Sequence, residues 1–234
     1  MNNSMRPFAL IAPRPGTLLA RLPEAQREEL LFQGRTGWVP AGQCLFRAGD
    51  PLTHVLVILR GVVKLKMVTA DGDEVLAGVR VVGDVLGDAE ALSGTTAHHT
   101  FAFAGTAGVE VRTIGREVFN RQMQLMPAEA TGYLAEQVHN NLWHHLMTRR
   151  STRARLALLL YDLAVRHGQP APAGGRVIDL GLTRTELGSA IGASRVSVDR
   201  VLTAMTAMGL ITTGYREITI IDLSGLAQAA ALEP

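Results

Sequence analysis

The stretch LTRTELGSAIGASRVSVDRVLTAMTAMGLI, Leu182 to Ile211, has the pattern of two short helices joined by a tight turn. Thr183 and Glu186 form a Thr-x-x-Glu capping box, in which the Thr oxygen and the Glu carboxylate accept hydrogen bonds from amides at a helix start. Gly192 then supplies the permissive backbone that a sharp turn needs. The stretch therefore predicts a helix-turn-helix.

The second helix of this pair has a buried face and an open face. Ser194 is a good N-cap, and apolar residues recur every three or four positions up to Gly209: Val198, Val201, Leu202, Met205 and Met208. The open side carries Arg195, Val196, Asp199, Arg200 and Thr203. Because the N-terminal end of such a helix can enter a DNA major groove, its arginines are candidates for guanine recognition.

A short hairpin is predicted directly after this pair. Residues 210–213 and 217–222 alternate apolar and polar side chains around Gly214. This hairpin would be the wing of a winged helix-turn-helix, which favours DNA binding. Any compact pair of helices can carry the same spacing, so a winged domain that serves as a protein interaction surface is the alternative hypothesis.

Length and composition restrict the class of protein. A chain of 234 residues allows one or two domains with ordinary cores. Cys44 is the only cysteine, which excludes an internal disulfide or a four-cysteine zinc site on one chain and suits a reducing cytoplasm. The sequence has no run of about 18 apolar residues and no signal-peptide pattern at its start. We therefore expect a cytoplasmic protein without a membrane partner.

Residues 37–115 have the texture of strands. Short β-prone runs are separated by Gly and Asp turns, and they cover 38–39, 44–46, 54–59, 62–68, 75–82, 100–104 and 109–114. Asp71-Gly72 is a strong hairpin sequence. Many short strands at even spacing predict an antiparallel roll or sandwich whose core can hold a small ligand.

The stretch VPAGQCLFRAGDPLTHVLVILRGVVKL, Val39 to Leu65, resembles the start of the cyclic-nucleotide-binding roll of the CRP/FNR transcription regulators. The C-terminal part resembles their winged helix-turn-helix, so the resemblance covers about residues 24–225. It implies an α+β fold with an N-terminal antiparallel β-roll for an effector (17–126), a long dimerisation helix (127–150) and a DNA-binding domain (151–234). It also implies a homodimer on two-fold symmetric double-stranded DNA, with RNA polymerase as a further partner.

The segment after Met126-Pro127 fits the dimer helix that this resemblance implies. Side chains at alternating steps of four and three form a heptad seam whose first members are apolar and whose later members are polar: Leu134, Val138, Asn141, His145 and Thr148. An ordinary amphipathic helix that packs on its own roll is the alternative interpretation.

The effector pocket departs from the family pattern. Gly87-Asp88 stand where the resemblance implies Gly-Glu, whose carboxylate meets a ribose hydroxyl, and His98 stands where it implies an Arg for the cyclic phosphate. Asp is shorter than Glu, and His has an ordinary pKa near 6.5, so the permanent positive fork is missing. One alternative is that His98 and His99 bind cyclic AMP or another nucleotide without the family's arginine. The other is that the loop is structural and the regulator needs no effector.

Contacts from the long helix to a bound base have two alternative positions. Counting from Pro127 gives His144 and His145, whereas counting back from Ser151 gives Asn140 and Asn141. Either pair can hydrogen-bond a ligand.

Other chemistry has little support in the sequence. We do not expect haem, because nothing singles out an axial ligand among Cys44, His98 and His99. An iron-sulfur cluster of the FNR type lacks the necessary cysteines. The sequence has no recognisable Ser/His/Asp or Cys/His catalytic set, so an enzyme is not expected.

On the DNA side, the resemblance implies base contacts from Arg195, Val196 and Arg200. It places the following residues near phosphates: Thr183, Arg184, Ser194 and Ser197. Val196 replaces a Glu that is common in the family and accepts from cytosine, so we predict a half-site that differs there from the family's TGTGA. Asp199 replaces a small residue and is expected to repel a nearby phosphate.

Overall fold

A computed structural model describes residues 13–146, 150–172 and 174–231, with the backbone alone for 138–146 and 231. The chain divides into two units. One contains Met1–Met67 and Gly78–Val138, and the other contains Val68–Ala77 and His139–Pro234. In the described parts of the chain, no helix is long and apolar enough to cross a membrane.

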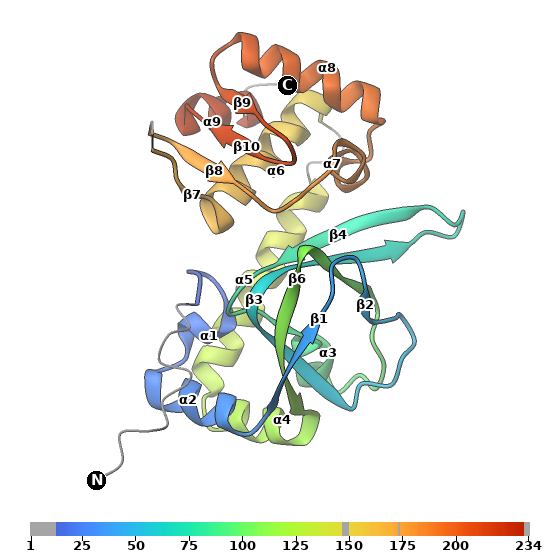
Figure 1. Ribbon diagram of the computed structural model, residues 1–234, viewed down its shortest axis with the longest axis vertical. Helices are drawn as coiled ribbons and strands as arrows, with labels where there is room; N and C mark the ends of the chain where they lie inside the picture. Colours follow the sequence, from blue (N-terminus) through green and yellow to red (C-terminus); the bar gives the residue numbers. More distant parts are fainter. Residues whose placement is uncertain (1–12, 147–149, 173, 232–234) are drawn as a thin grey trace. The chain divides into compact units, whose positions relative to one another are not determined.

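The first unit is built on an antiparallel sheet (Figure 1). The strand order is β1 (Arg35–Val39), β6 (Phe101–Gly115), β3 (His54–Val68) and β4 (Glu74–Arg80). Two short strands complete it, because β2 (Cys44–Phe46) pairs with β6 and β5 (Val85–Leu86) pairs with β3. The predicted antiparallel roll is confirmed.

Strand β3 is buried on both faces. Val55 and Val57 point into a core shared with helices, whereas Leu56 and Ile58 point into a second core inside the roll. Successive side chains of a strand alternate between its faces, so a strand that separates two cores is apolar at consecutive positions. This explains the uninterrupted run VLVIL.

The prediction of separate strands at 54–59 and 62–68 was wrong, since β3 is continuous. The glycine between them does not end the strand but bends it. Gly61 has a φ of +92°, and a Cβ there would lie 2.4 Å from the carbonyl oxygen of Gly108 on β6. The register shifts between Gly61 and Val63, as at a β-bulge. The predicted strands at 100–104 and 109–114 are likewise one strand, β6.

Helices cover the first core. They are α1 (Leu18–Arg21), α2 (Glu24–Phe32), α3 (Asp88–Ser93), α4 (Arg116–Gln124) and α5 (Pro127–Leu146). Leu30, Phe119 and Tyr133 from three of these helices are almost completely buried there. Arg21 of α1 forms an ion pair with Glu136 of α5. The first part of α5 is therefore packed on its own roll.

The second unit places helices around a small sheet. Its elements are α6 (Thr152–His167), β7 (Gln169–Pro170), β8 (Arg176–Ile178), α7 (Arg184–Ile191), α8 (Arg195–Ala207), β9 (Ile211–Thr213), β10 (Ile218–Ile220) and α9 (Leu223–Ala231). The strand order is β7-β8-β10-β9. Leu156 and Leu160 of α6 are buried, together with Val198, Leu202 and Met205 of α8.

The predicted wing is confirmed by the sheet, because β9 and β10 pair as a hairpin with Ile211 opposite Ile220. Gln169 and Pro170, which follow α6, pair with β8. The N–H of Ala171 also donates to the Gly175 carbonyl at 3.2 Å, which closes a turn there.

Candidate nucleic-acid interface and effector cavity

Helix α7 begins with the predicted capping box. The Thr183 Oγ1 accepts from the Glu186 N–H at 3.1 Å, and the Glu186 Oε2 accepts from the Thr183 N–H at 2.8 Å. These two hydrogen bonds satisfy amides that would otherwise lack partners at the helix start. They fix the backbone at Arg184, the first helical residue.

The turn between α7 and α8 depends on local backbone geometry. Gly192 ends α7 with a φ of +63°, in the left-handed region that favours glycine. The Ala193 N–H donates to the Gly188 carbonyl at 2.9 Å, and the Ser194 Oγ accepts from the Ser197 N–H at 3.2 Å. Ser194 is therefore the N-cap of α8, as predicted, and its hydroxyl is used in that cap.

Helix α8 presents an open face opposite its buried one. The Val196 side chain is 67% exposed, and Arg195 and Arg200 are exposed as well. Thr203 is on the same side, and its hydroxyl donates to the Asp199 carbonyl at 2.9 Å. An exposed apolar side chain between two arginines has no packing role within the unit, so this face is available to a partner.

Asp199 lies between two arginines from different helices. Its Oδ1 is 3.5 Å from the Arg184 Nε, and its Oδ2 is 3.7 Å from the Arg195 Nε. The three side chains are 47%, 34% and 70% exposed, respectively, so water screens these pairs and their contribution to stability is small. Asp199, which we expect to repel a nearby phosphate, thus has two arginines beside its carboxylate.

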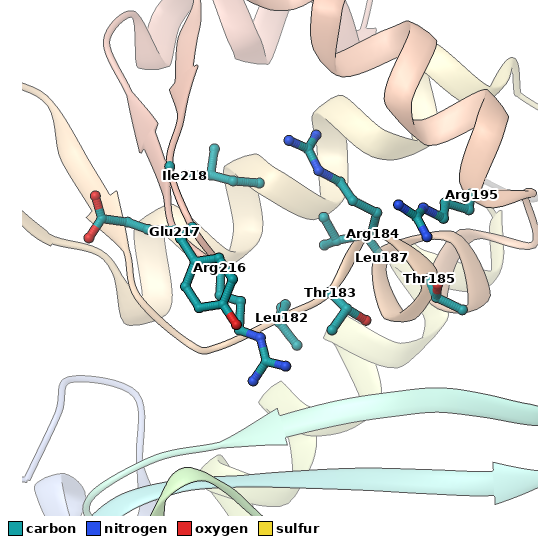
Figure 2. A pocket seen from close by; sticks show the side chains of 11 residues that line it. Leu182, Thr183, Arg184, Thr185, Leu187, Arg195, Arg216, Glu217 and Ile218 are labelled. Carbon is teal, nitrogen blue, oxygen red and sulfur yellow. The ribbon is translucent and has the colours of Figure 1, made fainter.

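An open groove of about 470 Å³ lies between the start of α7 and the wing (Figure 2). Figure 2 shows Arg184 and Arg195 on one side and Arg216 with Glu217 on the other. The remaining lining residues are Leu182, Thr183, Thr185, Leu187, Gly214, Tyr215 and Ile218. Three arginines around an open groove suit a polyanion such as a phosphate backbone.

The sequence reasoning missed the tip of the wing. Tyr215 is 89% exposed, and the Arg216 guanidinium lies 5.5 Å from the centre of its ring. Arg216 has a φ of +57°, which is uncommon for a residue other than glycine. The dipeptide Tyr-Arg after Gly214 could have indicated a contact site at the wing tip. An aromatic and a cationic side chain at the tip of a hairpin cannot be buried in the core of the domain.

The roll contains a cavity of about 450 Å³. Its apolar wall includes Phe46, Leu65, Val85, Leu86, Leu92 and Leu134. Its polar wall is formed by Arg80, Asp88, Glu90, Ser93, His99 and Thr100, with Gly87 and Ala89 between them. Of the residues expected to bind an effector, the structure thus places Gly87, Asp88 and His99 in this wall. Leu134, expected on the dimer seam, also faces it.

His98 is placed elsewhere. Its ring stacks on Phe46, with ring centroids 3.7 Å apart and an angle of 9° between the planes. It is almost fully buried, and burial lowers the pKa of the His98 imidazole below its ordinary value. A neutral stacked ring supplies no positive charge for a phosphate. The ring of His98, expected at the phosphate position, thus packs against Phe46.

The cation in the cavity wall is Arg80, which sequence reasoning also missed. Burial lowers the pKa of Arg80, but nearby carboxylates outweigh this effect and the net pKa is raised. These carboxylates belong to Asp84, Asp88 and Glu90. Among the described residues of the wall, Arg80 is the only Arg or Lys. A phosphate bound in the cavity would compete with these carboxylates for its charge.

Asp88 is buried at the start of α3. Burial raises the pKa of the Asp88 carboxyl above its ordinary value, although the Arg80 guanidinium and the Tyr133 hydroxyl act in the opposite direction. Its Oδ1 accepts from the Ala89 N–H at 2.8 Å. Burial also raises the pKa of Tyr133 well above its ordinary value. Asp88 is thus surrounded by groups of its own chain.

The remaining expected site residues have no described side chains. Asn140, Asn141, His144 and His145 belong to the α5 backbone, but their side chains lie outside the described part of the structure. Within the described residues, no three His, Cys, Asp or Glu side chains come together as a metal site would require. The Cys44 thiol donates to the Phe46 carbonyl at 3.0 Å.

Comparison with known proteins gave two matching family models. Residues 37–125 match the cyclic nucleotide-binding domain, and residues 154–229 match the Crp-like helix-turn-helix domain. The chain is 30% identical over 203 residues to the fumarate nitrate reduction regulatory protein of Klebsiella oxytoca, covering 82% of this chain and 77% of that protein. It is 26% identical over 191 residues to the global nitrogen regulator of Synechococcus elongatus, covering 80% and 86%.

Solved structures with the same fold include two bacterial proteins. FixK2 from Bradyrhizobium japonicum superposes with a TM-score of 0.73 at 20% identity, covering 86% of this chain and 99% of that one. The c-di-GMP responsive global regulator CLP of Xanthomonas campestris gives a TM-score of 0.68 at 17% identity, covering 85% and 99%. At these identities the likeness shows the fold.

Proposed function

Because this chain belongs to the CRP/FNR family of DNA-binding transcription regulators, we propose that it binds a two-fold symmetric DNA site as a homodimer and reads each half-site with α8. The observation that carries this proposal is the open face of α8, where Arg195 and Arg200 flank the exposed Val196. An Arg fork can bond two acceptors of one guanine. In this proposal Val196 meets an apolar base edge such as a thymine methyl.

Phosphate contacts come from the surroundings of α8. We place Thr183, Arg184, Ser194 and Ser197 against the DNA backbone, because they lie at the starts of α7 and α8. A helix N-terminus carries partial positive charge and free amides, which favour a phosphate. Family membership alone supports contact with RNA polymerase. It also supports the division into a roll (17–126), a dimerisation helix (127–150) and a DNA-binding domain (151–234).

The DNA-binding part is tested by a shift assay with purified protein and a selected DNA site. Wild type is expected to shift the site, and the double variant Arg195→Ala with Arg200→Ala is expected to bind it no better than random DNA. Equal shifts by both proteins would show that α8 does not read the site. They would favour the alternative, a winged domain that binds another protein.

The cavity supports a second part of the proposal. We propose that a small effector other than cyclic AMP sets DNA affinity, because the only arginine in the described cavity wall is balanced by carboxylates and His98 is stacked on Phe46. Such an effector acts only through its different affinity for two states of the dimer. In calorimetry, nucleotide-free protein should give no heat with micromolar cyclic AMP. Saturation at one ligand per chain would overturn this part.

A further inference from the structure

Each helix of the helix-turn-helix begins with an arginine, and the Asp199 carboxylate lies close to both arginines. Arg184 is the first residue of α7, and Arg195 is the first residue of α8. A cation at this position faces the positive end of a helix dipole, which is unfavourable. Helix α8 has no acidic residue in its first turn, and Glu186 of α7 accepts from the Thr183 N–H in the capping box. Asp199 is a carboxylate close to both arginines.

The geometry of Asp199 places one carboxylate beside both guanidinium groups. Each carboxylate oxygen takes one arginine, with Nε distances of 3.5 Å to Arg184 and 3.7 Å to Arg195. A long arginine side chain loses rotamer freedom when it reads a base, so a partner that restrains it beforehand reduces that loss. Arg200 differs from Arg184 and Arg195, because the structure gives it no ion pair among the described residues.

We propose that Asp199 is a positioning residue that trades non-specific DNA affinity for base discrimination, an inference that rests on the proposed function. It orients Arg195 toward the base edge, and it neutralises Arg184, which would otherwise attract any phosphate. A phosphate of the DNA backbone must compete with Asp199 for Arg184. Random DNA therefore gains little from Arg184, whereas a matching half-site gains from an oriented Arg195.

Asp199→Asn tests this idea, because the amide keeps the shape of the side chain and removes its charge. Without the carboxylate, the phosphate that Arg184 contacts no longer competes with Asp199. The slope of log affinity against log salt should steepen by up to about 0.9 for each chain, because Arg184 then neutralises that phosphate fully. Affinity for random DNA should rise at low salt. Discrimination at the base pair facing Arg195 should fall by at least about fivefold, because that side chain is no longer oriented.

The matched control is Asp162→Asn. Asp162 also forms an ion pair with an arginine of its own helix four residues away, Arg166 on α6, so this variant removes the same charge from an ion pair on another helix. It should leave the salt slope and the discrimination unchanged. Asp199→Glu, which retains a carboxylate, should recover the wild-type slope. Thermal unfolding of each variant shows that the fold is retained.

The readout is a titration of the selected site and of all its single base-pair variants at several salt concentrations. A loss confined to the base pair facing Arg195, with a steeper slope, supports positioning. Three results overturn it: no change in slope, a change equal to that of Asp162→Asn, or a uniform loss at every base pair. If wild type binds no selected site at all, the proposed function fails instead.

Discussion

Arg200 carries the simplest test of base reading at the scale of one residue. It is exposed on the open face of α8, and among the described residues it has no ion pair that its removal would leave unbalanced. Arg200→Ala should weaken binding to the selected site by about 1–3 kcal/mol and leave binding to random DNA nearly unchanged. Anisotropy titrations with both DNAs measure this. A parallel loss on both DNAs would instead make Arg200 a phosphate contact.

Asp88 gives a second test through its dependence on pH. Because burial raises the pKa of the folded carboxyl above its unfolded value, its ionisation destabilises the fold. The stability linked to its proton is complete below the unfolded pKa and is lost as pH rises through the folded one. Asp88→Asn should therefore be more stable than wild type at pH 7, and the difference should shrink as the pH falls toward the unfolded pKa.

Urea unfolding of both proteins between pH 4 and 8 measures this difference. An Asn variant that is less stable at pH 7 and recovers on acidification would contradict the expectation. That result would show Asp88 acting as a stabilising anion for Arg80.

Single residues also show which parts of the site can be predicted from sequence. The caps at Thr183 and Ser194 were predictable, because a capping residue bonds an amide two or three positions away. The pairing of Asp199 with Arg184 was not, because Arg184 comes from another helix and the approach of the two side chains depends on how α7 and α8 pack. Arg80 was missed for the same reason, since β4 and α3 meet only in the folded roll.

At the scale of elements, the bend of β3 depends on one backbone position. Gly61 and Gly72 both have a positive φ, of +92° and +86°. A Cβ at Gly61 would lie 2.4 Å from the Gly108 carbonyl oxygen, whereas a Cβ at Gly72 would meet nothing within 4 Å. Both alanine variants suffer left-handed strain of about 1–2 kcal/mol, but only Gly61→Ala adds a backbone clash.

Unfolding measurements should therefore find that Gly61→Ala loses more stability than Gly72→Ala, because the shared strain cancels and only Gly61→Ala adds a clash. Equal losses would mean that the bulge tolerates a side chain. The comparison also explains the wrong strand boundaries. A glycine reads as a turn in the sequence, and only the pairing with β6 shows that it is a bulge within one strand.

At the scale of the whole molecule, the roll and the winged helix-turn-helix could be recognised from the sequence, because each has its own periodicity and glycine pattern. The α5 seam was harder to assign from sequence. Leu134 lines the roll cavity and packs against the core of its own roll, so a heptad position is also a contact within the chain. A seven-residue pattern cannot distinguish burial in a dimer seam from burial against the chain's own roll, because both require an apolar side chain.

Dimerisation is expected from the family and tested by sedimentation. Wild type should sediment as two chains at micromolar concentration, and Val138→Asp should shift it toward one chain, because a carboxylate in an apolar seam is costly to bury. DNA affinity should fall with it, since one chain reaches only one half-site. A variant that remains a dimer with unchanged DNA affinity would place the seam elsewhere.

Selection of binding sites from random DNA by the wild-type protein is the most direct measurement of DNA reading by α8. It should enrich a symmetric sequence with half-sites about one helical turn apart and with a base other than that of TGTGA facing Val196. Recovery of an unmodified TGTGA palindrome would contradict the role given to Val196. Failure to enrich any symmetric site would contradict sequence reading by a dimer.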